Sequence, residues 1–313
     1  MITTVTLNAS IDKAYHMVED IKGGTVMRVA KIHNSAGGKG LNVARVTRLC
    51  GSKVQATGLV GGFNGGYLES LAEKDGISCD FGHIAGETRS CINILDPRFG
   101  STEFLEPGSP VSADELETYL ADVPRIIANS EVVTISGSLP AGVGADAYQR
   151  LIALCKKEGK LVILDSSGEA LRCGIEAGPT MIKPNKDEIE ALCGVRAQSL
   201  QDVVACAREL HGRGVANVVI SLGGEGALLV CDEGSFKAAP PKVEAVNVVG
   251  CGDSMVAAFA VALERRLSPT EALMYAVATA TASALSPNTG EFDATVREGL
   301  LSEVTIETVE ERS

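Results

Sequence analysis

Continuous apolar runs that alternate with helical patterns constrain the fold of this chain more than any other feature. Leu161-Val162-Ile163-Leu164 is one such run. A strand that is apolar on both faces belongs in a parallel sheet that helices cover on both sides. Strands are predicted at residues 2–7, 54–60, 132–136, 161–165, 180–183, 218–222 and 227–231. Helices are predicted at residues 41–49, 67–73, 113–123, 145–158, 186–193, 200–211, 253–266 and 270–285. The pattern predicts an α/β fold, with ligands beyond the carboxyl ends of the strands.

Two segments, residues 12–34 and 89–106, break this alternation because they contain strand patterns with no helix between them. Residues 26–32 and 90–94 alternate, and Pro97-Arg98-Phe99-Gly100 predicts a hairpin turn. We expect a small antiparallel sheet inserted into the α/β body. Such a half-exposed sheet must cover a ligand, pair with another subunit, or both. The body would comprise residues 1–11, 35–88 and 107–313.

The charge and cysteine content exclude several classes of function. The 313 residues carry a formal net charge of -12 at pH 7, without a block of Lys and Arg, so nucleic acid and membrane surfaces are poor partners. Nine cysteines without a C-x-x-C pair and four isolated histidines argue against a zinc site or a disulfide framework. The apolar runs are too short to span a bilayer, and the first residues do not resemble a signal peptide. We expect a cytoplasmic protein, with an acidic C-terminal segment, 303–313, that frays.

The run Gly250-Cys251-Gly252-Asp253 precedes a segment, 255–263, that is apolar on every side. A helix of this kind is buried, so its first N–H groups need partners inside the protein. The glycines leave these groups accessible to an anion, which a helix N-terminus favours. Asp253 would then receive the proton of a hydroxyl that attacks a transferring phosphoryl group. The alternative, equally compatible with the run, is that Asp253 caps the helix and the glycines only form a turn.

A second glycine-rich run, Gly37-Gly38-Lys39-Gly40, also precedes a predicted helix. Its glycines would let a ligand approach the backbone, and Lys39 would meet a phosphate as a point charge. The spacing is not that of a Walker A loop. Taken alone, the run is better interpreted as a flexible turn with a solvated lysine.

Three further loops have both a structural and a functional interpretation. Asn185 and Glu188 have the spacing of a capping box, and the same side chains could lie near metal-bound phosphates. The run Ser221-x-Gly223-Gly224-x-Gly226 joins two predicted strands and is typical of a nucleotide-binding turn or a plain hairpin. Residues 137–140 follow a strand, where a ligand-binding loop is expected.

A relaxed dinucleotide-binding motif, Gly142-x-Gly144-x-x-Ala147, also requires consideration. Asp165 ends a strand about twenty residues further on, as this motif requires. Residues 137–141 nevertheless separate the motif from the preceding strand. An NAD-dependent oxidoreductase is therefore the weaker hypothesis.

Together and in this order, the motifs resemble those of the phosphofructokinase B family of the ribokinase-like superfamily, especially its branch of 1-phosphofructokinases and tagatose-6-phosphate kinases. The resemblance covers nearly the whole chain. It implies a ribokinase-like three-layer α/β/α domain with a mostly parallel central sheet and a small antiparallel β-sheet lid, which often mediates homodimer formation. The motifs are Thr6-Leu7-Asn8-Ala9-Ser10-Ile11-Asp12, Gly37-Gly38-Lys39-Gly40-x-Asn42, Glu87-Thr88-Arg89, Gly137-Ser138-Leu139-Pro140, Lys183-Pro184-Asn185-x-x-Glu188, Ser221-x-Gly223-Gly224-x-Gly226 and Gly250-Cys251-Gly252-Asp253.

The resemblance implies a kinase that uses ATP with Mg²⁺ to phosphorylate a hydroxymethyl group of a ketohexose phosphate. Fructose 1-phosphate is the preferred substrate, and tagatose 6-phosphate and fructose 6-phosphate are the alternatives. The residues implied for catalysis are Asp253, as the base, and the N–H groups of Gly250, Cys251 and Gly252. Those implied for the sugar phosphate are Asp12, Gly37, Gly38, Lys39, Asn42, Arg89 and Ser138. Those implied for ATP and Mg²⁺ are Asn185, Glu188, Ser221, Gly223, Gly224 and Gly226, with no direct protein ligand to the metal.

Some positions depart from the pattern of this family. Ala9 stands where proline is usual, and Cys251 replaces the common alanine. Asn247 and its neighbours lack the aspartate that many ribokinase-like enzymes use for a monovalent cation, which places a dependence on K⁺ in doubt. A kinase for an uncharged sugar or nucleoside and a catalytically silent binding protein are further hypotheses. Lys39 and Arg89 argue against the first, and Asp253 argues against the second.

Overall fold

The computed structural model describes residues 1–98 and 100–310. Its large sheet consists of β1 (Ile2–Thr6), β4 (Val54–Gly61), β5 (Ser78–Cys79), β6 (Gly82–Ile84), β9 (Val132–Ser136), β10 (Leu161–Asp165), β11 (Met181–Ile182), β12 (Asn217–Ser221), β13 (Ala227–Cys231), β14 (Gly234–Ala239) and β15 (Thr305–Thr308). Its small sheet consists of β2 (Ser10–Met17), β3 (Val29–Gly37), β7 (Arg89–Asp96) and β8 (Gly100–Leu105). The helices are α1 (Lys39–Leu49), α2 (Gly62–Lys74), α3 (Ala113–Ile126), α4 (Ala147–Lys157), α5 (Gly168–Ile175), α6 (Lys186–Cys193), α7 (Leu200–Gly212), α8 (Cys251–Glu264), α9 (Pro269–Ala284) and α10 (Ala294–Leu301), with the short 3₁₀ helix η1 (Gly223–Glu225).

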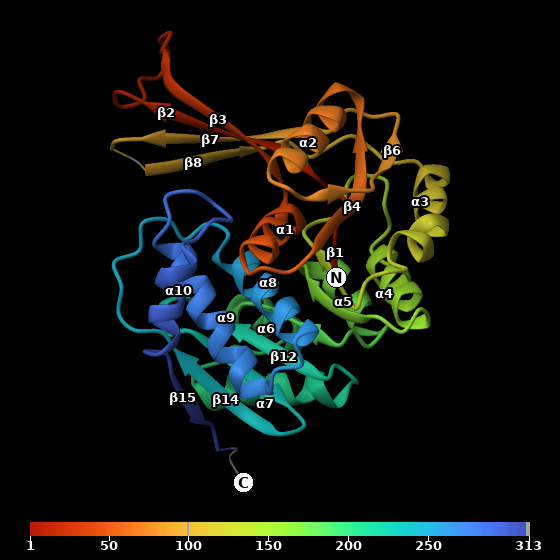
Figure 1. The fold of residues 1–313 in the computed structure, drawn as a ribbon, viewed down its shortest axis with the longest axis vertical. Helices are drawn as coiled ribbons and strands as arrows, with labels where there is room; N and C mark the ends of the chain where they lie inside the picture. Colours follow the sequence, from red (N-terminus) through yellow and green to blue (C-terminus); the bar gives the residue numbers. More distant parts are fainter. Residues whose placement is uncertain (99, 311–313) are drawn as a thin grey trace.

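The large sheet forms the middle of three layers (Figure 1). Its order is β15-β14-β13-β12-β11-β10-β9-β1-β4-β5, with β6 beside β4. The pairings from β12 to β5 are parallel, and those from β12 through β15 are antiparallel. The predicted three-layer fold with a mostly parallel sheet is thereby confirmed.

Helices bury both faces of this sheet, as its continuous apolar strands require. Helices α3 to α7 pack on one face, around side chains such as Tyr148 and Ile135. Helices α1, α8, α9 and α10 pack on the other, around Val256 and Phe259. Helix α8 is buried on every side, as predicted. None of the helices in the described part of the chain has the length and apolar character needed to cross a membrane.

The small sheet projects from the body at the upper left of Figure 1, in the order β3-β2-β7-β8. The pairs β2–β3 and β7–β8 are antiparallel, but β2 and β7 pair in parallel from Ser10 opposite Arg89 onward. The prediction of an antiparallel sheet is therefore wrong for the central pair. The chain leaves the body along β2 in the first inserted segment and along β7 in the second. These two outgoing strands lie side by side and are therefore parallel, and the returning strands β3 and β8 form the two edges of the sheet. Phe99, in the predicted turn, lies outside the described residues.

The C-terminal segment was also predicted incorrectly, because it forms a strand where we expected fraying. Strand β15 pairs with β14 and extends the large sheet, with Thr305 opposite Ala239 and Thr308 opposite Phe236. An acidic segment can form an edge strand when its backbone is paired and its charged side chains face water. Residues 311–313 of the predicted frayed segment lie outside the described part.

Candidate active site

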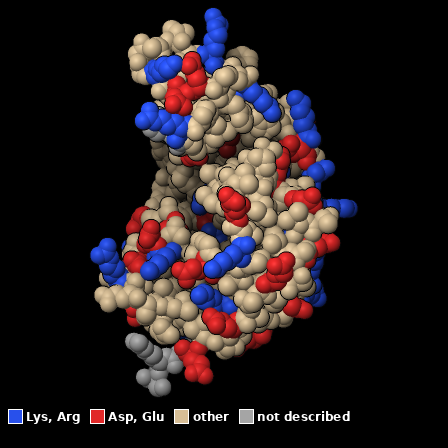
Figure 2. All heavy atoms as spheres, turned by 90° about the vertical axis from the view of Figure 1, so that its left-hand side faces the viewer, with Lys and Arg blue, Asp and Glu red and all other residues tan. Residues whose placement is uncertain are grey.

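Polar residues follow the carboxyl ends of adjacent parallel strands of the large sheet. Asn8 follows β1, Ser138 follows β9, Asp165 ends β10, Lys183 follows β11 and Ser221 ends β12. Because these strands run in the same direction, their carboxyl ends meet at one edge of the sheet. Figure 2 shows the molecule hollowed between the small sheet and the body, with acidic and basic side chains in the hollow.

The start of α8 has no side-chain cap. Gly250 occupies the cap position with a φ of 82°, and a Cβ there would lie 2.6 Å from Cγ2 of Thr289. Of the first three N–H groups of the helix, only that of Cys251 has a partner among the described residues, the carbonyl of Val248 at 3.4 Å. The hypothesis that Asp253 caps the helix is therefore wrong. The open N–H groups and the helix dipole form a site suited to an anion.

Asp253 is buried within the first turn of α8, with an exposed fraction of 5%. Its Oδ2 accepts a hydrogen bond of 2.9 Å from Nδ2 of Asn42, on α1. Burial, reinforced by the carboxylate of Asp165, raises the pKa of Asp253 to about 6, although Lys39 and Lys183 oppose the shift. A carboxylate with such a pKa is well matched to accepting a proton near neutral pH.

Two lysines and the buried Asp165 lie beside this carboxylate. Nζ of Lys39 is 3.3 Å from Oδ2 of Asp165, and Nζ of Lys183 is 3.4 Å from Oδ1. The second contact is an ion pair without hydrogen-bond geometry, since Oδ1 makes no hydrogen bond among the described residues. Burial alone would lower the pKa of Lys39, but Asp165 and Asp253 together raise it and keep the ammonium charged. A Cβ at Gly252 would lie 3.3 Å from Nζ of Lys183, so this ammonium lies against the start of α8.

The sequence motifs gave neither Asp165 nor Lys183 a catalytic or phosphate-binding role. Each is a charged residue at the carboxyl end of a buried parallel strand, β10 or β11. That position is itself a signal for a ligand site in an α/β sheet. The signal was present in the sequence but is weak for any single residue.

Asp12 lies where the small sheet joins the body. Its Oδ1 accepts a hydrogen bond of 2.7 Å from Oγ of Ser10. A Cβ at Gly37 would lie 2.1 Å from Cγ of Asp12, so only glycine leaves room for this carboxylate. Burial raises the pKa of Asp12, whereas Ser10, Arg89, Arg45 and the backbone of Gly38 oppose the increase. The structure thus brings the predicted Asp12, Gly37 and Gly38 together.

Arg89 and Ser138 meet through Asn8, at the end of β1. Nη1 of Arg89 donates to the carbonyl of Glu106 at 2.8 Å, and Nη2 donates to the carbonyl of Asn8 at 3.0 Å. Nδ2 of Asn8 donates to Oγ of Ser138 at 3.3 Å. The ammonium of Lys39, which the resemblance associates with Arg89, instead pairs with Asp165. The two predicted phosphate-binding cations therefore have different partners in this structure.

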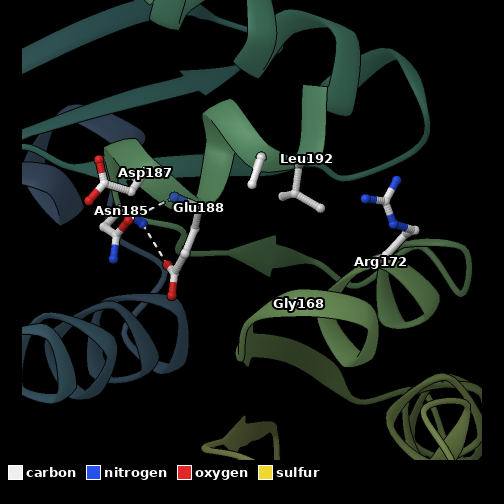
Figure 3. A pocket seen from close by; sticks show the side chains of 7 residues that line it. Gly168, Arg172, Asn185, Asp187, Glu188 and Leu192 are labelled. Atoms are coloured by element: carbon white, nitrogen blue, oxygen red, sulfur yellow. Dashed lines mark hydrogen bonds between the residues drawn. The ribbon is translucent and has the colours of Figure 1, made fainter. Parts of the chain in front are cut away.

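Asn185 and Glu188 form the predicted capping box at the start of α6 (Figure 3). Oδ1 of Asn185 accepts from the N–H of Glu188 at 2.8 Å, and Oε2 of Glu188 accepts from the N–H of Asn185 at 2.8 Å. Ser221 lies beside them, since it forms a parallel bridge with Asn185. Both cap residues line a surface pocket, whose other lining residues are Gly168, Arg172, Asp187, Ala191 and Leu192.

The glycine run between β12 and β13 forms a tight turn around η1. The N–H of Leu222 donates to the carbonyl of Gly226 at 2.9 Å. A Cβ at Gly226 would lie 2.0 Å from the carbonyl oxygen of Ala238, so packing against β14 already requires glycine there. Gly223 and Gly224 have open space around them. Their part in nucleotide binding stays a prediction.

The geometry around Gly142 does not support a dinucleotide site. A Cβ at Gly142 would lie 2.4 Å from the carbonyl oxygen of Val111, so packing explains this glycine. Helix α4 begins only at Ala147, well after β9 has ended at Ser136. The strand, tight turn and helix that such a motif requires are therefore not contiguous.

Comparisons with known proteins agree with this arrangement. A sequence model described as pfkB family carbohydrate kinase matches residues 5–295. The structure of phosphofructokinase-2 from Escherichia coli in complex with potassium is 31% identical, with a TM-score of 0.91 over 96% of this chain and 98% of that chain. A candidate 1-phosphofructokinase from Thermotoga maritima is 26% identical, with a TM-score of 0.89 over 99% of this chain and 100% of that chain. The chain therefore belongs to the pfkB family of carbohydrate kinases.

Proposed function

We propose that this kinase transfers the γ-phosphoryl group of ATP to a hydroxymethyl group of fructose 1-phosphate, forming fructose 1,6-bisphosphate. The observation that carries the proposal is Asp253, a buried carboxylate with a pKa of about 6 beside an uncapped helix start. Tagatose 6-phosphate and fructose 6-phosphate are the alternative acceptors. A structure of the Escherichia coli relative contains fructose 6-phosphate, and the Thermotoga maritima relative is a candidate 1-phosphofructokinase, so both positions of the substrate phosphate occur among similar proteins.

Asp253 would act as the general base of this transfer. As the acceptor oxygen bonds to the γ-phosphorus, its proton moves to Asp253, and the bond between that phosphorus and the ADP oxygen breaks. Asn42 holds Oδ2 of Asp253, which leaves Oδ1 to take the proton. The N–H groups at the start of α8 would stabilise the charge on the transferring phosphoryl oxygens.

Lys39 and Lys183 would supply the positive charge that the transferring group needs. Both ammonium groups pair with Asp165 beside Asp253. Their charges offset the two carboxylates, which matters in a chain whose net charge is -12. On this proposal Lys39 serves the transferring phosphoryl group, whereas the resemblance implied that it grips the sugar phosphate together with Arg89.

The sugar phosphate would lie between the small sheet and the body. Asp12 and Asn42 would hold sugar hydroxyls, with Gly37 and Gly38 leaving space for them. Arg89 and Ser138, linked through Asn8, would bind the phosphate already on the sugar.

ATP would bind along the loops that end β11 and β12. We place Glu188 near a Mg²⁺ ion carried by the ATP phosphates, because it lines the pocket at the start of α6 and its negative charge helps to raise the pKa of Lys39. The ion would neutralise charge between the β- and γ-phosphates. Among the described residues, no cluster of three or more acidic, His or Cys side chains could hold a metal alone. Ser221, Gly223 and Gly224 would line the nucleotide.

The small sheet would act as a lid over the sugar and join two copies of the chain. We place the lid at residues 12–34 and 89–106. Apolar side chains are exposed on these segments, and the exposed fraction of Val26 is 97%. Apolar side chains that are exposed on one small element suit a contact surface when they lie together. The exposed side chains are Val18, Ile21, Val26, Ile32, Phe104 and Leu105.

Steady-state kinetics with ATP and each of the three sugar phosphates test the acceptor. We expect the highest kcat/KM with fructose 1-phosphate, and a higher value with either alternative would assign the enzyme to that substrate. Arg89→Ala should raise the KM for the sugar phosphate far more than that for ATP. Equal increases would show that Arg89 does not hold the sugar phosphate.

Hydrogen exchange and sedimentation test the lid. Segments 12–34 and 89–106 should exchange more slowly when the sugar phosphate is bound, and the protein should sediment as a dimer. A monomer with substrate-dependent protection would retain the lid and reject the dimer. Identical exchange with and without substrate would reject the lid.

A further inference from the structure

Arg45, one turn after Asn42 on α1, is a buried arginine outside the residues assigned to the site. Its exposed fraction is 8%, and its guanidinium donates in three directions. Nε donates to Oδ2 of Asp75 at 2.9 Å, Nη2 to the carbonyl of Ala36 at 2.9 Å and Nη1 to Oδ1 of Asn42 at 3.2 Å. A Cβ at Gly290 would lie 3.0 Å from Nη1, so the loop after α9 packs against the guanidinium.

The chemistry of Arg45 fixes the orientation of the Asn42 amide. A guanidinium has donors only, so the carbonyl oxygen of Asn42 must face it. The amide nitrogen then points the other way and donates to Oδ2 of Asp253 at 2.9 Å. If the amide were reversed, its NH₂ group would face the N–H donors of Arg45, and its oxygen would face the carboxylate of Asp253.

We propose that Arg45 is a positioning residue for phosphoryl transfer, which acts through Asn42 to select the oxygen of Asp253 that takes the proton. The proposal rests on the proposed function and extends it to a side chain that touches neither ATP nor sugar. Asp75, at the end of α2, and Ala36, at the end of β3, hold Arg45 in place. The orientation of the base thus depends on the body and on the root of the small sheet.

The hydrogen bond from Asn42 also affects the titration of Asp253. This bond favours the charged carboxylate, so losing it raises the pKa of Asp253. A base with a raised pKa stays protonated up to a higher pH, so the acid limb of the kcat/KM profile shifts to higher pH. The other titratable groups that face Asp253 are Lys39 on α1, Asp165 on β10, Lys183 after β11 and Cys251 on α8.

The test compares Arg45→Lys with Arg48→Met, three positions further along the same helix. Lysine keeps the charge at position 45 but cannot form the guanidinium fork. We expect kcat of Arg45→Lys to fall by about 10- to 100-fold, with the KM for ATP changed less than about 2-fold and the acid limb moved upward. Arg48 is exposed, and its substitution should change none of these. A folded Arg45→Lys enzyme with the parent kcat and pH profile would overturn the proposal.

A double-mutant cycle separates positioning from a general structural role. If Arg45 acts through Asn42, Arg45→Lys should lower kcat far less in an Asn42→Ala background. The same factor in both backgrounds would overturn the proposal. If Arg45→Lys fails to fold, Asp75→Ala, which removes the acceptor of Nε of Arg45, replaces it in the cycle with the same expected direction.

A substrate-free measurement distinguishes failure of this inference from failure of the proposed function. The carboxyl ¹³C resonance of Asp253, assigned with Asp253→Asn, reports its titration by NMR. The pKa should rise in Arg45→Lys, and an unchanged pKa would overturn the inference even if the enzyme phosphorylates a sugar phosphate. If no sugar phosphate is phosphorylated, the proposed function fails, and a raised pKa still supports the role of Arg45 in orienting Asn42.

Discussion

The starts of helices α8 and α6 lie in the same candidate site but differ in how they are capped. Helix α6 has a side-chain cap, and α8 has none. At α6, the capping box satisfies two N–H groups with side chains, that of Glu188 and that of Asn185 itself. At α8, Gly250 provides no side chain, and Asp253 bonds to Asn42 instead. A side-chain cap uses the donors that a glycine cap leaves for a ligand. An anion is therefore expected at the start of α8. The start of α6 instead presents the side-chain oxygens that its capping box leaves unused.

The stability of each helix explains why this difference is tolerated. Helix α6 spans Lys186–Cys193 and buries only Ile189 among its residues, so it depends on its cap. Helix α8 spans Cys251–Glu264 and is buried along most of its length. Packing stabilises α8 without a cap, which frees its first turn for chemistry.

The largest effect that the comparison predicts is at Asp253. Asp253→Asn removes the base but keeps the shape of the first turn, so kcat should fall by about 10²- to 10⁴-fold while ATP affinity changes little. Rapid-quench measurement of phosphoryl transfer and titration of ATP binding check this result. Turnover close to that of the parent enzyme would show that Asp253 is not the base.

The next effect concerns the glycine cap of α8. Gly250→Ala introduces a Cβ 2.6 Å from Thr289 at a φ of 82°, so the protein should lose about 1–3 kcal/mol of stability and kcat should fall as the first turn shifts. Gly299→Ala is the control, since Gly299 lies within α10 with nothing within 4 Å. Thermal unfolding should show the control to be as stable as the parent or more so. Equal stability of the two variants would contradict the strain argument.

A smaller effect is expected at the capped helix. Glu188→Gln preserves the capping box but removes the charge proposed to face Mg²⁺, so the KM for Mg-ATP should rise by roughly 10-fold with a stability change under about 1 kcal/mol. Glu271→Gln makes the same change in the capping box of α9 and should leave the KM for Mg-ATP unchanged. If both variants alter that KM alike, or neither does, the charge of Glu188 has no part in binding the metal-nucleotide.

The smallest effect is a shift in pH dependence. The base must be deprotonated, so kcat/KM should fall as the pH drops below about 6. Asp165 raises the pKa of Asp253, so Asp165→Asn should lower that pKa and move the acid limb to lower pH. An upward movement of the acid limb would contradict the assignment of Asp165 as a cause of the raised pKa of Asp253.

Local patterns predicted the capping box and the buried elements around the candidate site because these features involve neighbouring residues. The capping box of Asn185 and Glu188 spans only four residues, and the composition of the apolar strands and of α8 already indicates that they are buried. The role of Asp253 could not be decided in this way. Its capping and catalytic interpretations fit the same run. Only the structure shows that α8 has no side-chain cap and that Asp253 instead accepts a hydrogen bond from Asn42, 211 positions away.

The sequence by itself determined the layer architecture, the order of the motifs and the family to which they belong. Tertiary structure alone decided the parallel pairing of β2 with β7, the strand β15, and the grouping of Asp165, Lys39 and Lys183 beside Asp253. The physical reason is the distance along the chain over which each kind of interaction acts. Propensity, periodicity and caps act over a few residues, whereas strand partners and ion pairs depend on which distant segments the packed core brings together.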